Sequence, residues 1–168
     1  MCYGTYAHMS DHDVNIRKAE ETDIPALARV WNDSWHAGHA HLQPEAAKHR
    51  DLPYFEARVG SNIDRMIVAE EEGEILGFSG WEGDGIGQVF VLPSHFGKQV
   101  APRLLATVEA ILRAEGHTTI WLHCAEGNDR ARAFYEKHGW SVTRTFDYEI
   151  GTHKGPILDR AWHMEKTF

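Results

Sequence analysis

The feature that most constrains the fold is a strand, a long amphipathic helix and a second strand within residues 86–124. Residues 86–92 (IGQVFVL) and 118–124 (TTIWLHC) have the length and the β-branched content of buried strands. Between them, residues 101–115 place apolar side chains at helical spacing, and Gly116 ends the pattern. Neighbouring strands joined by one helix run parallel through a right-handed crossover. The sequence therefore predicts a sheet that contains a parallel pair.

The other expected elements flank this crossover and complete the sheet. The predicted strands are 14–19, 65–71, 74–81, 140–150 and 157–165, and the predicted helical regions are 23–36, 44–59 and 128–138. Glu72 and Gly73 fit a tight hairpin turn, so strands 65–71 and 74–81 pair antiparallel. This order predicts an α/β (mixed α+β) fold, with a mixed central sheet of about seven strands and helices on both faces.

Length and composition fit one folded domain over residues 13–168. The chain has 168 residues, 42% of them hydrophobic, enough to bury a core. Residues 1–12 look unlike the rest, and we expect a disordered or non-native leader with the native start at Met9. No apolar run approaches the ~20 residues that a bilayer requires. We expect a cytoplasmic protein that needs no membrane.

Charge and metal-ligand spacing exclude two further classes. The formal net charge is −8, which disfavours binding to nucleic acid. The 12 histidines are scattered without HExxH or paired Cys/His spacing, so we expect no metal site. Cys2 and Cys124 are read as reduced thiols, and nothing in the sequence near Cys124 marks it as an activated nucleophile.

A short helical motif carries a family resemblance. In NDRARAFYEKHGW (128–140), Asn128 suits an N-cap and Gly139 a left-handed C-terminal position. Asn128 and Tyr135 lie seven residues apart, so they share one face of the helix. The string resembles the second cofactor-contacting motif of the GCN5-related N-acetyltransferases (GNAT), and the residues that match are Asn128, Ala131, Phe134, Tyr135, Glu136, Lys137, Gly139 and Trp140. The order of elements over 14–165 matches that family's fold as well.

This resemblance implies an activity and a cofactor. The expected reaction moves an acetyl group from acetyl-CoA to a primary amine by direct attack in a ternary complex. The acceptor stays open among small amines, amino-acid derivatives, antibiotics, peptide N-termini and lysines, and the acidic balance favours a cationic amine. Many members of this family form dimers, so the resemblance also implies a homodimer.

The loop before helix 101–115 matches the family's pyrophosphate-binding loop in part. That loop begins with Arg or Gln and has a central glycine, whereas here Phe96 and Gln99 stand at those positions. Gly97, Lys98, Val100 and Ala101 agree, and Pro102 lacks an N–H. A helix N-terminus with free N–H groups is a natural anion site. The alternatives are an ordinary turn without a ligand, and a non-catalytic sensor or interaction module with a degenerate loop.

The resemblance also assigns roles to individual residues. A backbone amide among Phe90, Val91 and Leu92 would polarise the thioester carbonyl, and Tyr135 would protonate the leaving thiolate. Asn128 would bond the pantetheine chain or fix its own loop, with Phe134 beside it. The structural alternatives are an N-cap role for Asn128 and a core role for Tyr135. The expected cofactor-binding residues are Phe90, Val91, Leu92, Phe96, Gly97, Lys98, Gln99, Val100, Ala101, Asn128, Phe134 and Tyr135.

The general base and the substrate pocket are assigned on weaker signals. Glu82 is the first candidate base, followed by Asp84 and then His123, and a water relay is an alternative. His36 and His39 would lie on a loop between the first two helices and line the substrate mouth. The remaining candidates for the substrate pocket are Trp35 and Trp81, which would form its wall, and His123. For each of these residues, a surface or core role is the competing interpretation.

Overall fold

The structure is a computed structural model that describes residues 14–168. It contains one seven-stranded sheet in the order β1-β2-β3-β4-β5-β7-β6, and the predicted fold class is confirmed. The strands are β1 (Asn15–Lys18), β2 (Met66–Glu71), β3 (Glu74–Glu82), β4 (Gly85–Val91), β5 (Thr119–Ala125), β6 (Ser141–Ile150) and β7 (Ile157–Thr167). The leader predicted over 1–12, its start at Met9 and the thiol of Cys2 lie outside the described residues.

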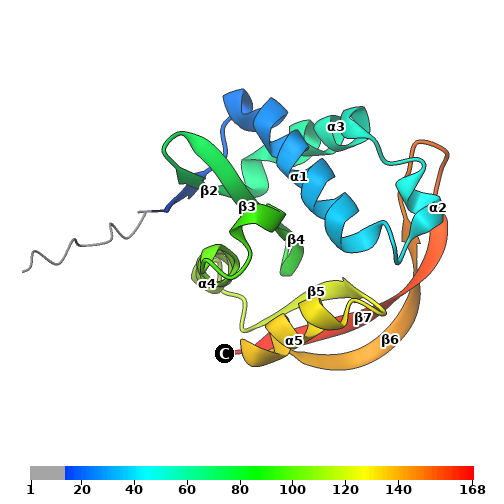
Figure 1. Ribbon diagram of the computed structural model, residues 1–168. Helices are drawn as coiled ribbons and strands as arrows, with labels where there is room; N and C mark the ends of the chain where they lie inside the picture. The colour runs from blue at the N-terminus through cyan, green and yellow to red at the C-terminus, as the bar shows by residue number, and fades with distance from the viewer. Residues whose placement is uncertain (1–13) are drawn as a thin grey trace, which may run out of the picture.

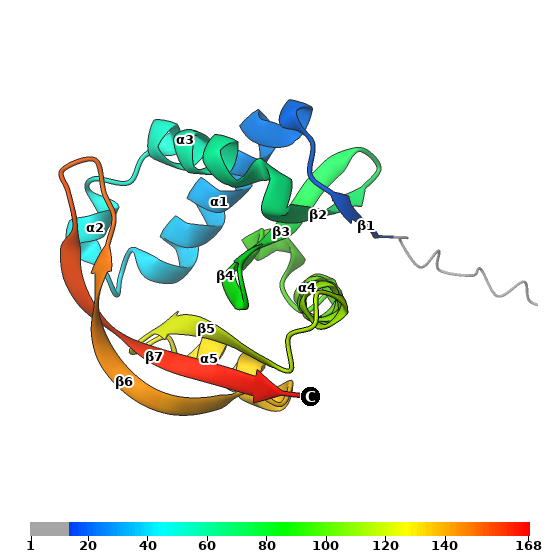
Figure 2. The same cartoon turned by 180° about the vertical axis from the view of Figure 1, so that it is seen from behind.

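Helices cover both faces of this sheet (Figures 1 and 2). On one face, α1 (Ile24–His39) and α3 (Leu52–Asn62) pack around a core that includes Trp31, Phe55 and Phe78. On the other face, α4 (Val100–Ala114) and α5 (Asp129–Lys137) pack over a second core with Leu104, Leu122 and Trp140. The short α2 (Pro44–Ala47) follows α1.

The parallel pair at the crossover is the shortest pairing in the sheet. Strands β4 and β5 pair at only two positions, Gly85 with Trp121 and Ile86 with Leu122. Beyond Ile86 the two strands diverge, although β4 keeps its pairing with β3 and β5 keeps its pairing with β7. A V-shaped opening in the sheet results. The backbone groups of Gly87–Val91 that face β5 have no strand to pair with.

The apex of the V is fixed by a tryptophan. The Trp121 indole donates from Nε1 to Asp84 Oδ1 at 2.8 Å, and its backbone N–H donates to the Asp84 carbonyl at 3.2 Å. Gly85 is required there, because a Cβ on it would lie 2.5 Å from Trp121 Cζ2. Asp84, a candidate base from the sequence, therefore holds the indole at the apex.

Two helix boundaries differ from the sequence prediction. The helical region predicted over 44–59 is two helices, because Asp51 adopts an extended conformation and caps α3, with its carboxylate accepting from the Tyr54 N–H at 3.1 Å. Pro53 in the first turn cannot continue a preceding helix. The predicted His-rich loop is wrong for His36 and His39, which lie in the last turn of α1, where the His39 ring stacks on Trp35.

The fit of Gly85 against Trp121 predicts a local stability effect. Gly85→Ala should lower the free energy of unfolding by about 1–3 kcal/mol, because the new methyl group overlaps the indole. Gly87→Ala is the matched control on the same strand, since the nearest atom to its Cβ would be 3.9 Å away, and it should change stability by less than about 0.5 kcal/mol. Urea denaturation measures both, and equal stabilities would contradict the proposed apex.

Candidate functional site

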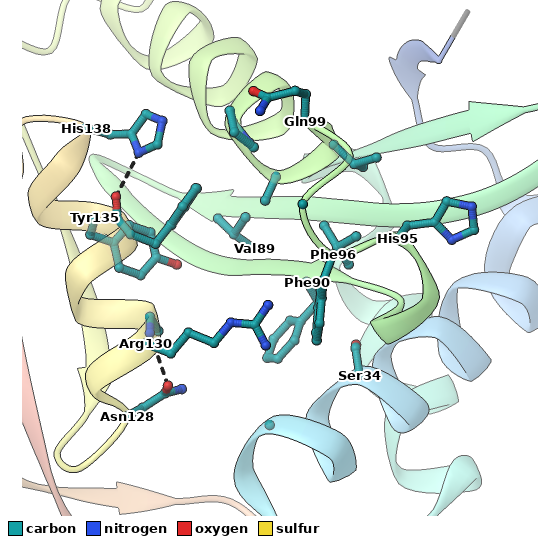
Figure 3. A pocket seen from close by; sticks show the side chains of 18 of the residues that line it. Ser34, Val89, Phe90, His95, Phe96, Gln99, Asn128, Arg130, Tyr135 and His138 are labelled. Carbon is teal, nitrogen blue, oxygen red and sulfur yellow. Dashed lines mark hydrogen bonds between the residues drawn. The ribbon is translucent and has the colours of Figure 1, made fainter. Parts of the chain in front are cut away.

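A cavity of about 440 Å³ opens where β4 and β5 separate (Figure 3). Its walls come from the end of β4, the β4–α4 loop, the first turn of α4, one side of α5, and the C-terminal half of α1. The lining residues are Ser34, Gly38, His39, Val89, Phe90, Val91, His95, Phe96, Gly97, Gln99, Val100, Ala101, Pro102, Asn128, Arg130, Ala131, Phe134, Tyr135, Lys137 and His138. Because α1 lies on one face of the sheet and α4 and α5 on the other, the cavity joins the two layers.

The β4–α4 loop directs free backbone donors toward this cavity. The N–H groups of Gly97, Gln99, Val100 and Ala101 donate to no other described residue. They lie at the N-terminus of the 15-residue helix α4, where the helix dipole adds positive potential. Gln99 has a left-handed backbone with φ of 63°. It thus takes the conformation that the family's central glycine would adopt freely, at some cost in strain.

The charge of the lining is opposite to that of the whole chain. Among residues 14–168, no Asp or Glu lines the cavity, whereas Arg130 and Lys137 both do, in a chain of net charge −8. The guanidinium of Arg130 reaches from α5 to the loop, and its Cζ lies 4.0 Å from the centre of the Phe96 ring, a cation–π contact. Phe96 is 42% exposed. Arg130 therefore supplies a cation where the loop itself has a phenyl ring.

Tyr135 and Asn128 occupy the α5 wall, as Figure 3 shows. The phenol of Tyr135 makes no hydrogen bond with a described residue. Burial raises its pKa far above the ordinary value, with a smaller contribution from Cys124, so the hydroxyl keeps its proton at neutral pH. Asn128 caps α5, and its side-chain Oδ1 accepts from the Ala131 N–H at 3.2 Å. Burial raises the pKa of the Cys124 thiol to about 12, which leaves it unreactive.

His39 is the histidine that α1 contributes to the cavity. Its ring stacks on Trp35, with centroids 5.7 Å apart and planes inclined by 7°, and lies 5.7 Å from the Phe90 ring. Burial, followed by the charge of Arg50, lowers its pKa to about 4. A backbone hydrogen bond to Trp35 acts in the opposite direction and outweighs neither effect. The imidazole is therefore neutral at physiological pH.

The structure gathers most of the predicted cofactor residues at this cavity. The two that lie outside the lining are Leu92 and Lys98. The residues that line it are Phe90, Val91, Phe96, Gly97, Gln99, Val100, Ala101, Asn128, Phe134 and Tyr135. These come from two short stretches of chain, each of which makes one wall.

The residues predicted for the base and the substrate pocket lie elsewhere, apart from His39. The Glu82 side chain is 79% exposed at the end of β3, with Oε1 3.7 Å from Arg65 Nη2. His123 lies on β5, with Nε2 3.0 Å from Nδ1 of His163. The remaining three also lie outside the lining: Trp35 and Trp81 are core residues, and His36 Nε2 is 2.7 Å from the Arg50 carbonyl oxygen.

A model of the "Acetyltransferase (GNAT) family" matches residues 24–140, which include every element that bounds the cavity. This chain belongs to the GNAT family. The predicted resemblance is confirmed.

Individual GNAT relatives are distant. An uncharacterized N-acetyltransferase of Mycobacterium tuberculosis is 28% identical over 93 residues, which are 52% of this chain and 60% of that protein. The match therefore spans less than two thirds of that relative's length. The peptidyl-lysine N-acetyltransferase YiaC of Escherichia coli is 28% identical over 129 residues, which cover 76% of this chain and 83% of YiaC.

Solved GNAT structures share the fold. A GCN5-related N-acetyltransferase from Rhodopseudomonas palustris superposes with a TM-score of 0.74 at 20% identity, covering 96% of this chain and 99% of that one. The PaiA N-acetyltransferase of Thermoplasma acidophilum, solved in complex with coenzyme A, gives a TM-score of 0.66 at 20% identity, covering 93% and 99% of the two chains.

Some residues that line the cavity of this GNAT domain were not predicted as site residues from the sequence. Arg130, Lys137 and His138 lie inside the 128–140 motif, so their helical spacing from Tyr135 was a usable signal. Ser34 and Gly38 come from α1 and carry no local motif. Over residues 14–168, no three metal-ligating side chains form a cluster, and no helix is long and apolar enough to cross a membrane.

The environment of His39 predicts a pH-dependent stability. Its folded pKa is about 4 against an ordinary 6.5, so between these values the unfolded chain binds the proton more tightly and stability falls as the pH is lowered. Between pH 7 and pH 4, the free energy of unfolding of His39→Asn should fall by about 3 kcal/mol less than that of wild type. His123, whose pKa is also lowered to about 4, is present in both proteins and cancels. Urea denaturation at each pH measures the free energy of unfolding. An equal fall in wild type and in His39→Asn would contradict the assignment.

Proposed function

We propose that this GNAT protein is an acetyl-CoA-dependent N-acetyltransferase that acetylates a primary amine by direct attack in a ternary complex. The observation that carries the proposal is the opened β4–β5 pair, whose cavity meets four unengaged N–H groups at the start of α4. The activity of YiaC on peptidyl-lysine and the coenzyme A bound to the Thermoplasma protein support the assignment.

The residues present fit a diphosphate and an extended amide chain. The N–H groups of Gly97, Gln99, Val100 and Ala101 would hold the diphosphate, with Arg130 as the nearby cation. The unpaired edge of β4 would hold the pantetheine arm in the manner of an added strand. When bound, acetyl-CoA supplies the activated acetyl group. The left-handed backbone of Gln99 favours this function over the alternative of a non-catalytic module with a degenerate loop.

The proton transfer to the leaving group is assigned to one lining residue. Tyr135, protonated and without a hydrogen-bond partner among residues 14–168, would donate its proton to the leaving sulfur. Neutral His39 lines the cavity on the α1 side, where it would face the incoming amine. Glu82 and His123 lie outside the cavity and receive no role here. A cytoplasmic location and a homodimer remain predictions.

Binding of the cofactor tests the function. Calorimetry should show wild-type protein binding acetyl-CoA, and Arg130→Ala should bind about tenfold more weakly with a shallower salt dependence, because a charge-assisted contact is lost. Arg132→Ala is the matched control, since Arg132 lies on the same helix, pairs with Glu136 at 2.8 Å and does not line the cavity. No binding by wild type at millimolar acetyl-CoA would overturn the proposed function. Equal affinities of wild type and Arg130→Ala would exclude only the role of Arg130 in cofactor binding.

Removal of the phenolic proton tests the role of Tyr135. Tyr135→Phe should reduce kcat by about 10- to 100-fold, since proton donation to the leaving group is lost. The affinity for acetyl-CoA should stay within about twofold of wild type, because the ring still fills the α5 wall. Thiol release with an amine panel measures kcat. Turnover that is unchanged across the pH range would remove Tyr135 from the mechanism.

A further inference from the structure

Two arginines lie stacked on aromatic rings on the α1–α3 side of the molecule. Arg50 precedes α3, and its Cζ lies 4.8 Å from the centre of the Trp35 ring and 5.1 Å from that of Tyr54. Arg58 lies on α3, with its Cζ 5.3 Å from the ring of Trp31 and 5.7 Å from the ring of Tyr54. Tyr54 thus contacts both guanidinium groups.

Neither arginine has a carboxylate partner among residues 14–168. Arg50 Nε donates to the Gly151 carbonyl at 2.9 Å, and Arg58 Nη1 donates to the Tyr54 hydroxyl at 3.2 Å. A guanidinium carries five N–H donors, and Arg58 Nε is buried with no hydrogen-bond partner. The chain has 25 acidic residues against 17 Lys and Arg, so carboxylates are not scarce in it.

The two charges also repel each other. Burial lowers the pKa of Arg50, and the proximity of Arg58 lowers it further. The nearby carboxylate of Asp51 is engaged, because its Oδ1 lies 2.6 Å from His153 Nε2 and 3.1 Å from the Tyr54 amide nitrogen. Partly buried cations of like sign with no counter-ion are unfavourable unless an anion joins them.

An open groove of about 540 Å³ lies against Arg58. Arg50 does not line it and is linked to it through Tyr54, a lining residue whose ring contacts both guanidinium groups. Arg58 lines it together with polar groups from α3 and the β6–β7 turn, namely Tyr54, Ser61, Asn62, Thr152 and His153. Gly151 permits the close approach of this turn, because a Cβ on it would lie 3.0 Å from the Tyr54 hydroxyl. The groove lies apart from the first cavity, which neither Arg50 nor Arg58 lines.

We propose that Arg50 and Arg58 form an anion site at this groove that binds a carboxylate or phosphate group. The planar fork of a guanidinium matches both groups in a bidentate manner. A single side chain, the indole of Trp35, connects the proposed site with the cofactor cavity, since it contacts both Arg50 and the cavity residue His39. The anion is therefore either a negative group on the amine acceptor, which rests on the proposed function, or a free anion, which does not.

Thermal unfolding in phosphate tests the site without reference to catalysis. At equal ionic strength and pH, sodium phosphate in place of sodium chloride should raise the wild-type Tm by about 3 °C. Arg58→Gln and Arg50→Gln should each lose most of that shift, measured against their own Tm in chloride. Arg58→Lys keeps the charge and should keep at least part of it.

A control variant keeps the anion site distinct from other arginines. Arg29→Ala removes an exposed arginine of α1. It should retain the shift that Arg58→Gln loses. The proposal is overturned by a wild-type Tm that does not respond to phosphate, or by Gln variants that respond as wild type does.

Matched acceptors identify the source of the anion. The probes are L-lysine against L-lysinamide and β-alanine against β-alaninamide. A carboxylate on the acceptor should raise kcat/KM at least about tenfold in wild type, and Arg50→Gln should abolish the preference. A phosphate shift without that preference assigns the site to a free anion. A preference that Arg50→Gln retains would exclude the acceptor as the source and leave a free anion, whereas failure to bind acetyl-CoA would overturn only the proposed function.

Discussion

The site depends on the point at which the β4–β5 ladder stops. Two paired positions hold the parallel strands together, and the indole of Trp121 against Gly85 fixes where pairing ends. Each strand remains paired on its other side, β4 with β3 and β5 with β7, so both halves of the sheet stay hydrogen-bonded around the opening. The released backbone groups are then available to a ligand with amides of its own. The position of α5 follows as well, because this helix begins just after β5 ends.

Charge is distributed so that the cavity differs from the rest of the molecule. An acidic surface repels an anionic cofactor only weakly at a distance, because salt screens it within about 10 Å. The described part of the chain places no carboxylate on the cavity wall, and the α4 N-terminus and Arg130 supply positive potential at short range. Position 96 carries a phenyl ring where the family resemblance implies Arg or Gln. That ring contacts the guanidinium of Arg130 from the opposite wall, so a cation still lies beside the loop.

Local signals predicted the elements and the walls that single stretches of chain build. Hydrophobic periodicity located the strands and α4, and Asn128 with Gly139 marked the ends of α5, with Gly139 at a φ of 88°. Placement across elements was harder to predict. Glu82 and Trp81 depend on the direction of a side chain on β3, where the register shifts between Gly80 and Trp81. Arg130 lay inside a recognised motif, but its partner Phe96 comes from another loop, which no local pattern indicates.

The preference for an acceptor is a question of short-range groups more than of net charge. The acidic balance of the chain predicts a cationic amine, but a net charge acts over the whole surface and mainly affects the rate of encounter. On the α1 side the cavity is lined by a neutral imidazole, His39, and beyond Trp35 lie Arg50 and Arg58, which have no carboxylate partner among residues 14–168. A neutral imidazole tolerates an amine, whereas the guanidinium pair would repel a second positive charge placed near it. The proposed anion site would therefore favour an acceptor in which a negative group accompanies the amine, because a charge interaction at a few ångströms outweighs the diffuse field of the distant acidic residues.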